Sequence, residues 1–128
     1  MEKPKLLIVE DDYESQSFLK IFFRNDYDTT IVESESGFHN VISEKSFDLI
    51  LMDISLPNGK DGIELTKEIK SNPATSKTPI VCLTAHAFLK DKARAMEAGA
   101  DYFLAKPVEN KILKNIVKQF CPTVLGSK

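Results

Sequence analysis

The sequence predicts an α/β fold in which five parallel strands alternate with five helices in one doubly wound sheet, order 2-1-3-4-5. Two observations lead to this prediction. Short apolar runs, typical of strands covered on both faces, alternate with segments whose apolar residues recur at helical spacing. The connections between them are short, as right-handed crossovers between parallel strands require. With 128 residues, the chain has the length of one domain.

The first two strand–helix units occupy the N-terminal third of the chain. The apolar run Lys5–Val9 predicts a buried strand, and the segment 29–33 predicts a second strand because β-branched residues are frequent there. A helix over about 13–25 is expected from four apolar residues at helical spacing, Phe18, Leu19, Phe22 and Phe23. A shorter second helix is marked by three residues on one face, Phe38, Val41 and Ile42.

The third unit is built around the almost wholly apolar segment Asp48–Met52, which predicts the central strand. This strand ends at a carboxylate, Asp53, in front of a turn rich in Pro, Asn and Gly. Asp61 and Glu64 have the spacing of a helix-capping pair, so a helix is expected to start there. It is expected to end before Pro73, because a proline disfavours helical geometry in the residue that precedes it.

The last two units follow the same plan. Strands are expected over 79–83 and 101–104, and a helix over about 87–98 should end at Gly99. The final helix is expected over about 108–120, where an apolar stripe is formed by Ile112, Leu113, Ile116, Val117 and Phe120. We therefore assign residues 1–120 to one domain, and 121–128 to a C-terminal tail or the start of a linker.

Composition narrows the functional classes. The net charge of −2 disfavours direct binding of nucleic acid, which usually requires a basic patch. No apolar run approaches the ~20 residues of a membrane span, and the N-terminal apolar run is too short for a secretion signal. Cys82 and Cys121 have no metal-ligand spacing and are expected to be buried thiols. A cytoplasmic location is therefore expected.

Polar residues follow four of the five predicted strands. Glu10 and Asp11 come after the first strand, Asp53 after the third, Thr84 after the fourth and Lys106 after the fifth. In the expected strand order the first and third strands are neighbours, roughly 4.8 Å apart, and their helices leave on opposite faces. The three carboxylates are expected to meet in the resulting crevice, with Thr84 and Lys106 beside them.

Such a cluster favours phosphoryl chemistry. Three carboxylates a few ångströms apart must take up protons or bind a cation, and Mg²⁺ suits a shallow oxygen site with room for water and phosphate. Lys106 adds a positive charge and Thr84 a hydroxyl, so phosphate oxygens could be bound on several sides. Asp53 is then the expected nucleophile. Asp12 is expected only to cap a helix, and His39 and His86 are expected to be exposed helical residues without a role.

Four segments carry a family resemblance, namely Leu-Leu-Ile-Val-Glu-Asp-Asp, Asp-Leu-Ile-Leu-Met-Asp-Ile-Ser-Leu-Pro, Ile-Val-Cys-Leu-Thr-Ala and Gly-Ala-Asp-Tyr-Phe-Leu-Ala-Lys-Pro. In this order the chain resembles the receiver domain of two-component response regulators, which has a flavodoxin-like fold, from about Lys5 to Phe120. The resemblance implies that Asp53 accepts a phosphoryl group from a phosphohistidine of a histidine kinase or histidine phosphotransfer protein. It implies no enzymatic activity beyond the domain's own phosphorylation and dephosphorylation.

The resemblance also implies roles for the neighbouring residues. Mg²⁺ would be held by the carboxylates of Glu10, Asp11 and Asp53 and by the backbone carbonyl of Ser55. Thr84 and Lys106 would bind phosphate oxygens, and the Lys106-Pro107 peptide bond would be cis. On phosphorylation Thr84 would move toward the phosphate and Phe103 would turn into the vacated space. The surface formed by the fourth helix, fifth strand and fifth helix would then signal to a downstream protein, and dimerisation on phosphorylation stays open.

Three alternatives remain at this point. A phosphatase of the haloacid-dehalogenase type also forms an aspartyl phosphate, but it carries a second carboxylate where this chain has Ser55. A flavodoxin-like FMN protein would need a hydroxyl- and glycine-rich loop in place of Glu10-Asp11-Asp12. A pseudo-receiver would serve only as an unphosphorylated interaction module. One departure from the family pattern is the loop Asn58–Gly62, which is one residue longer than the commonest form. A stand-alone receiver and a receiver from a longer protein are both compatible with the sequence.

Overall fold

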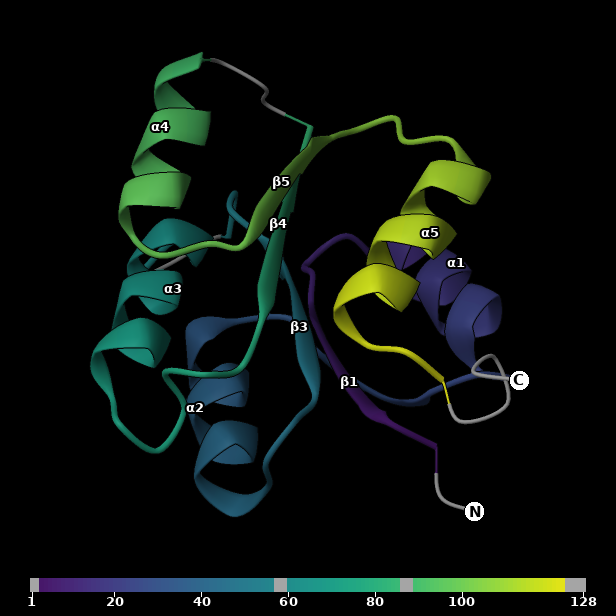
Figure 1. The fold of residues 1–128 in the computed structure, drawn as a ribbon, viewed down its shortest axis with the longest axis horizontal. Coiled ribbons are helices and arrows are strands. Elements are labelled where there is room, and N and C mark those ends of the chain that lie inside the picture. The colour runs from purple at the N-terminus through teal and green to yellow at the C-terminus, as the bar shows by residue number, and fades with distance from the viewer. Residues whose placement is uncertain (1–2, 57–59, 86–88, 124–128) are drawn as a thin grey trace.

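Five parallel strands form one sheet in the order β2-β1-β3-β4-β5, as the sequence predicts (Figure 1). The computed structural model describes residues 3–56, 60–85 and 89–123. The strands are β1 Lys5–Val9, β2 Asp28–Val32, β3 Leu49–Asp53, β4 Ile80–Thr84 and β5 Tyr102–Ala105. The helices are α1 Tyr13–Phe23, α2 Glu35–Glu44, α3 Gly62–Ser71, α4 Leu89–Glu97 and α5 Asn110–Phe120.

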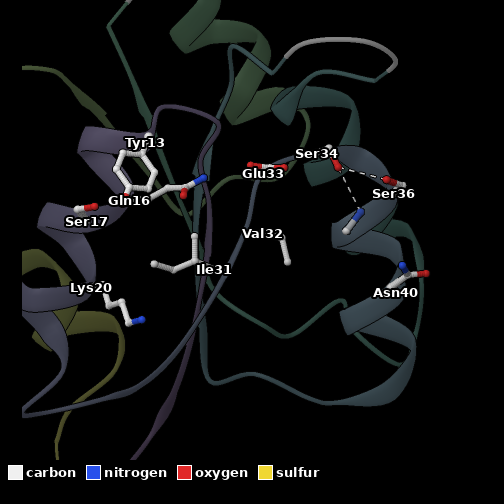
Figure 2. Close-up of a pocket in the computed structure, with 11 residues that line it drawn as sticks. Tyr13, Gln16, Ser17, Lys20, Ile31, Val32, Glu33, Ser34, Ser36 and Asn40 are labelled. Carbon is white, nitrogen blue, oxygen red and sulfur yellow. Dashed lines mark hydrogen bonds between the residues drawn. The ribbon is translucent and has the colours of Figure 1, made fainter.

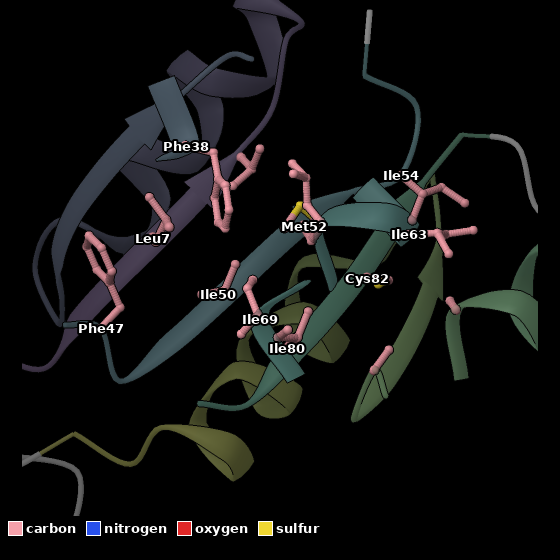
Figure 3. Packing of buried hydrophobic residues seen from close by; sticks show 14 residues of the cluster. Leu7, Phe38, Phe47, Ile50, Met52, Ile54, Ile63, Ile69, Ile80 and Cys82 are labelled. Atoms are coloured by element: carbon pink, nitrogen blue, oxygen red, sulfur yellow. The ribbon is translucent and has the colours of Figure 1, made fainter. Parts of the chain in front are cut away.

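The helices cover the sheet on both faces, with α2, α3 and α4 on one side and α1 and α5 on the other (Figure 1). Alternate residues of the strands supply the two cores, because successive side chains of a strand point to opposite faces. In β3, Ile50 and Met52 pack toward α2–α4, whereas Leu49 and Leu51 pack toward α1 and α5 (Figure 3). Burial on both faces explains why this strand is apolar at four successive positions.

Several local predictions are confirmed. The Asp12 carboxylate caps α1 by accepting a hydrogen bond from the Ser15 N–H, and Asp61 and Glu64 form a capping box at the start of α3. Gly99 follows α4 with φ of 108°, a conformation that favours glycine. The Lys106-Pro107 peptide bond is cis. The predicted start of the fourth helix, at residue 87, lies outside the described residues.

Two of the apolar residues that mark the first and last helices in the sequence are on the surface. Phe18 of α1 is 45% exposed and Ile112 of α5 is 46% exposed, although both lie among apolar residues at helical spacing. Each helix buries only a narrow face against the sheet, formed by Leu19 and Phe23 in α1 and by Leu113 and Val117 in α5. The sequence pattern is wider than this face, so it could not separate buried positions from flanking ones.

A buried hydrogen bond joins the end of the described chain to the turn after α1. The Tyr27 hydroxyl donates to the Cys121 carbonyl oxygen at 2.6 Å, and both residues are buried. Tyr27 directly precedes β2, so this bond lies at the edge of the sheet where the strands begin. Burial raises the pKa of the Tyr27 hydroxyl above its usual range. Among the described helices, none has both the length and the apolar character needed to cross a membrane.

Neither cysteine is expected to react with a thiol reagent in the folded protein. Cys82 and Cys121 are free and buried, and burial raises the pKa of each thiol to about 11. The reactive form is the thiolate, which is therefore scarce at pH 8. A colorimetric disulfide reagent should label about none of the thiols in native protein and both after denaturation. Rapid labelling of either thiol under native conditions would contradict this description of the core.

Candidate functional site

Asp53 lies at the carboxyl end of the central strand β3, where its side chain is 7% exposed. The Ser55 N–H donates to Asp53 Oδ1 at 2.9 Å, which fixes the orientation of the carboxylate. Behind it, the backbone turns sharply into α3, and the Gly62 N–H donates to the Ile54 carbonyl at 3.2 Å. Gly62 is packed against the backbone of Asp53 so closely that no Cβ atom would fit there.

Two further carboxylates approach Asp53. Glu10 and Asp11 follow β1, the neighbour of β3, and one oxygen from each of the three carboxylates lies within 4.8 Å of the others. Glu10 is only 2% exposed, whereas Asp11 is exposed. The predicted meeting of these three residues in one crevice is therefore confirmed. The cluster is partly buried and open on the side of Asp11.

The cluster does not tolerate three negative charges without compensation. Burial, together with the hydrogen bond and negative charge of Glu10, raises the pKa of Asp53 to about 7, while the Ser55 N–H and Lys106 act in the opposite direction. Without a cation, Asp53 therefore holds a proton over much of the acidic range. Carboxylate oxygens are ligands that Mg²⁺ prefers, so the side chains of Glu10, Asp11 and Asp53 fit a magnesium ion.

Glu10 is held from three sides. Lys106 Nζ lies 2.6 Å from Glu10 Oε1, the Asp12 N–H donates to Glu10 Oε2 at 3.2 Å, and Gln16 Nε2 donates to the Glu10 carbonyl oxygen at 2.6 Å. Lys106 thus reaches the cluster as predicted, but its direct partner is Glu10 and not Asp53. Gln16 was missed by the sequence analysis, because a helical glutamine carries no signal that it will turn back to a strand end.

Thr84 and Ser55 lie on the other side of Asp53. Thr84 ends β4 and is fully buried, and its hydroxyl lies 3.4 Å from the Ser55 hydroxyl. Phe103 of β5 is partly buried and packs against the core that faces α2–α4. The structure thus gathers Glu10, Asp11, Asp53, Ser55, Thr84 and Lys106 at one edge of the sheet. Their functional roles stay predictions.

His39 lies in α2, as predicted, and it has a partner that the sequence did not reveal. Its side chain is partly buried, and His39 Nε2 lies 3.0 Å from Glu68 Oε1. Glu68 belongs to α3, which is 29 residues away in sequence but packs on the same face of the sheet as α2. Sequence spacing within one helix could not reveal this contact. His86 and residues 57–59 of the longer loop lie outside the described residues.

Asp53→Asn is expected to stabilise the protein in the absence of divalent ions. The pKa of Asp53 is raised in the folded state, so the folded protein binds more protons than the unfolded chain between about pH 4 and pH 7, and stability falls as the pH rises through that window. Asparagine removes this penalty, so the gain should grow with pH and reach ~2 kcal/mol at pH 8. Urea unfolding at pH 5 and pH 8, in the presence of a chelator, measures this difference in the free energy of unfolding. Asp28→Asn, at the exposed end of β2, is the control.

Two cavities adjoin α1. A groove of about 530 Å³ lies beside the carboxylate cluster and is lined mainly by apolar groups, among them Phe18, Leu19, Pro107, Val108 and Leu113. A second cavity of about 540 Å³ lies between α1 and α2 at the open edge of β2 (Figure 2). Its lining is mostly polar and contains no predicted site residue. Only the first cavity borders the site, through Asp12 and Lys106.

Comparison with known proteins agrees with this geometry. A family model described as the response regulator receiver domain matches residues 6–118. The protein PetR of Rhodobacter capsulatus is 37% identical over 111 residues, which are 86% of this chain and 45% of PetR. The sensor protein GacS of Pseudomonas syringae is 33% identical over 119 residues, 89% of this chain and 13% of GacS. The chain therefore spans less than half the length of these curated relatives.

A similar solved structure contains a metal ion. The receiver domain of the sensor histidine kinase PA1611 from Pseudomonas aeruginosa aligns with a TM-score of 0.83 and 30% identity, covering 92% of this chain and 97% of that one. That structure is described with a magnesium ion coordinated in its active-site cleft.

Proposed function

Because the chain belongs to the response regulator receiver domain family, we propose that Asp53 accepts a phosphoryl group from a phosphohistidine of a histidine kinase or histidine phosphotransfer protein. The observation that supports this most directly is the position of Asp53. It is a buried carboxylate at the end of the central strand, gathered with Glu10 and Asp11, and the Lys106 ammonium group contacts Glu10 beside it. A buried acidic cluster of this kind is costly unless a cation or a reaction uses it.

In the proposed reaction, a carboxylate oxygen of Asp53 attacks the phosphorus atom of the donor. A P–O bond forms, the P–N bond to the donor imidazole breaks, and the imidazole leaves with the electron pair of that bond. Glu10, Asp11, Asp53 and the carbonyl of Ser55 would hold Mg²⁺, which supplies positive charge to the phosphate oxygens. Lys106 would turn from Glu10 to a phosphate oxygen, and the Thr84 hydroxyl would donate to another.

Treatment with acetyl phosphate and Mg²⁺, followed by intact-mass measurement, tests the proposal. The wild type should gain one phosphoryl group, Asp53→Asn should gain none, and Asp28→Asn should behave as the wild type. Phosphorylation that persists in Asp53→Asn would refute the assignment of the acceptor. Sustained phosphate release from unrelated phosphomonoesters would instead favour the phosphatase, and no phosphorylation at all would favour the pseudo-receiver.

The groove beside the cluster is the proposed docking site of the donor. It joins Lys106 to an apolar surface on which Phe18 is 45% exposed, and an exposed aromatic residue beside a reactive group is well placed for a protein contact. Phe18→Ala should therefore slow transfer from a histidine phosphotransfer protein by about 10-fold or more, because an interface anchor is worth roughly 1–2 kcal/mol. Phosphorylation by acetyl phosphate should be unchanged. Equal slowing with both donors would contradict the docking role.

The proposed output is a change in the surface formed by α4, β5 and α5. Thr84 would be drawn toward the phosphate, and Phe103, which packs beneath α4, would follow into the released space. This surface carries three exposed apolar residues, Met96, Tyr102 and Ile112. A downstream protein is the proposed partner, and a second phosphorylated copy is an alternative one.

The remaining parts of the proposal concern boundaries and location. We assign residues 1–120 to the receiver domain and 121–128 to a tail or the start of a linker, in which Cys121 and Thr123 still pack against the domain. The cytoplasm is the proposed location, because its reducing conditions keep free thiols such as those of this chain reduced.

A further inference from the structure

A second group of metal-ligating side chains lies between α2 and α3, apart from the carboxylate cluster around Asp53. Glu35 and His39 occupy one face of α2 at i, i+4 spacing, and Glu68 faces them from α3. One ligand atom from each of the three side chains lies within 4.8 Å of the others. His39 Nε2 is 3.0 Å from Glu68 Oε1, and His39 Nδ1 is 3.9 Å from Glu35 Oε2.

The charges in this group are incompletely balanced. Glu35 and Glu68 carry two negative charges, and among the described residues the Lys60 ammonium group contacts Glu68, whereas Glu35 is met only by the backbone of Lys60 and by His39. Lys60 Nζ lies 2.7 Å from Glu68 Oε2, and the Lys60 N–H donates to Glu35 Oε1 at 3.0 Å. Each of these contacts uses one oxygen of its carboxylate and leaves the second oxygen facing His39. One oxygen of each glutamate thus faces the His39 ring, Glu35 at Nδ1 and Glu68 at Nε2.

We propose that Glu35, His39 and Glu68 bind Zn²⁺ and thereby link α2 to α3. An imidazole nitrogen with two carboxylate oxygens is a ligand set typical of zinc, whereas Mg²⁺ prefers oxygen ligands alone. Two ligand atoms on a tetrahedral zinc ion lie ~3.4 Å apart, close to the present distance between His39 and Glu68. A water molecule would complete the coordination.

Only a small rearrangement is required to form this site. His39 presents different ring nitrogens to the two glutamates, so the Glu35 side chain must move to share the nitrogen that binds the ion. The three side chains are partly exposed, with values of 26% for Glu35, 41% for His39 and 37% for Glu68, and they have room to rotate. Bound zinc would also restrict Lys60, because the Lys60 ammonium group contacts Glu68 and its backbone N–H donates to Glu35.

The chain offers well-matched controls for a binding experiment. It contains two histidines and two cysteines, and both cysteines are buried and unable to capture zinc in the folded protein. Zinc chloride should be titrated into the protein by calorimetry, with millimolar Mg²⁺ present to occupy the carboxylate cluster. The wild type, His86→Ala and Asp53→Asn should each bind one zinc ion with similar affinity. His39→Ala and Glu68→Gln should weaken binding at least 10-fold.

A second measurement locates the ion directly. The long-range ¹H–¹⁵N spectrum of the imidazole rings should show the signals of His39 shifting on addition of zinc, while those of His86 stay in place. Thermal unfolding without metal checks that the His39 and Glu68 variants are folded. The proposal is wrong if the wild type does not bind, if His39→Ala binds equally well, or if Asp53→Asn alone abolishes binding. Because Asp53→Asn should keep the zinc site, this result is independent of the proposed phosphorylation.

Discussion

Gly62→Ala is expected to lower the free energy of unfolding by about 3 kcal/mol, the high end of the range for a residue forced into a packed site. A Cβ atom built on Gly62 would lie 2.1 Å from the carbonyl oxygen of Asp53 and 2.7 Å from Cα of Ile54. Both are backbone atoms of the segment that carries the proposed acceptor carboxylate, so no side-chain rotation can relieve the clash. The start of α3 must separate from the end of β3.

The same change should reduce phosphorylation, because any shift of this backbone displaces Asp53 and the carbonyl of Ser55. Urea unfolding and acetyl phosphate labelling measure the two effects. Gly37→Ala is the matched control, since its Cβ would meet only side-chain atoms, those of Val32 at 3.3 Å and Ser34 at 3.7 Å, and alanine is favoured over glycine within a helix. An unchanged unfolding midpoint for Gly62→Ala would show that the close packing of β3 and α3 is wrong.

Lys106→Met should destabilise the metal-free protein by about 3 kcal/mol at pH 8, because it leaves Glu10 charged and buried without its partner. Glu10 is 2% exposed, and the Lys106 ammonium group lies 2.6 Å from its carboxylate. The loss should shrink when Mg²⁺ is added, because the ion would compensate the negative charge of Glu10. Methionine keeps most of the length of lysine, so packing changes little.

Chemical denaturation at pH 8 with and without Mg²⁺ measures this effect. Lys114→Met on the exposed side of α5 is the control, and its stability should stay within about 0.5 kcal/mol of the wild type. Labelling with acetyl phosphate should be strongly slowed in Lys106→Met alone. A loss of stability that is independent of Mg²⁺ would show that Lys106 acts through packing rather than through charge.

The sheet was predictable because its signals are local. β1 matches its predicted bounds, and β3 and β4 differ by one residue at each end, which places Asp53 and Thr84 inside the strands. The meeting of the carboxylates was also predictable, since the order of parallel strands determines which strand ends are neighbours. Which positions of each helix are buried was harder to predict. Phe18 and Ile112 show that apolar spacing marks a broad stripe and not the narrower surface that the sheet covers.

Contacts between elements distant in sequence were not predictable. His39 meets Glu68, 29 residues away, because α2 and α3 pack on the same face of the sheet. Gln16 is only six residues from Glu10, but a helical glutamine carries no signal that its side chain will contact a strand end. The close packing of Gly62 was only partly indicated by the sequence, which has a glycine directly after the capping residue Asp61. The sequence alone could not show that the neighbouring backbone was that of Asp53.

The hydrogen bond between the Tyr27 hydroxyl and the Cys121 carbonyl determines the position at which a C-terminal fusion partner or fluorescent label would be connected to the domain. That point lies at the amino edge of the sheet, and each strand of five residues rises ~16 Å toward the opposite edge. Cargo joined after Thr123 would therefore start far from Asp53 and leave its entrance open. A reporter attached there could follow the protein without obstructing the proposed phosphorylation, whereas one attached near Lys106 would block the proposed docking groove.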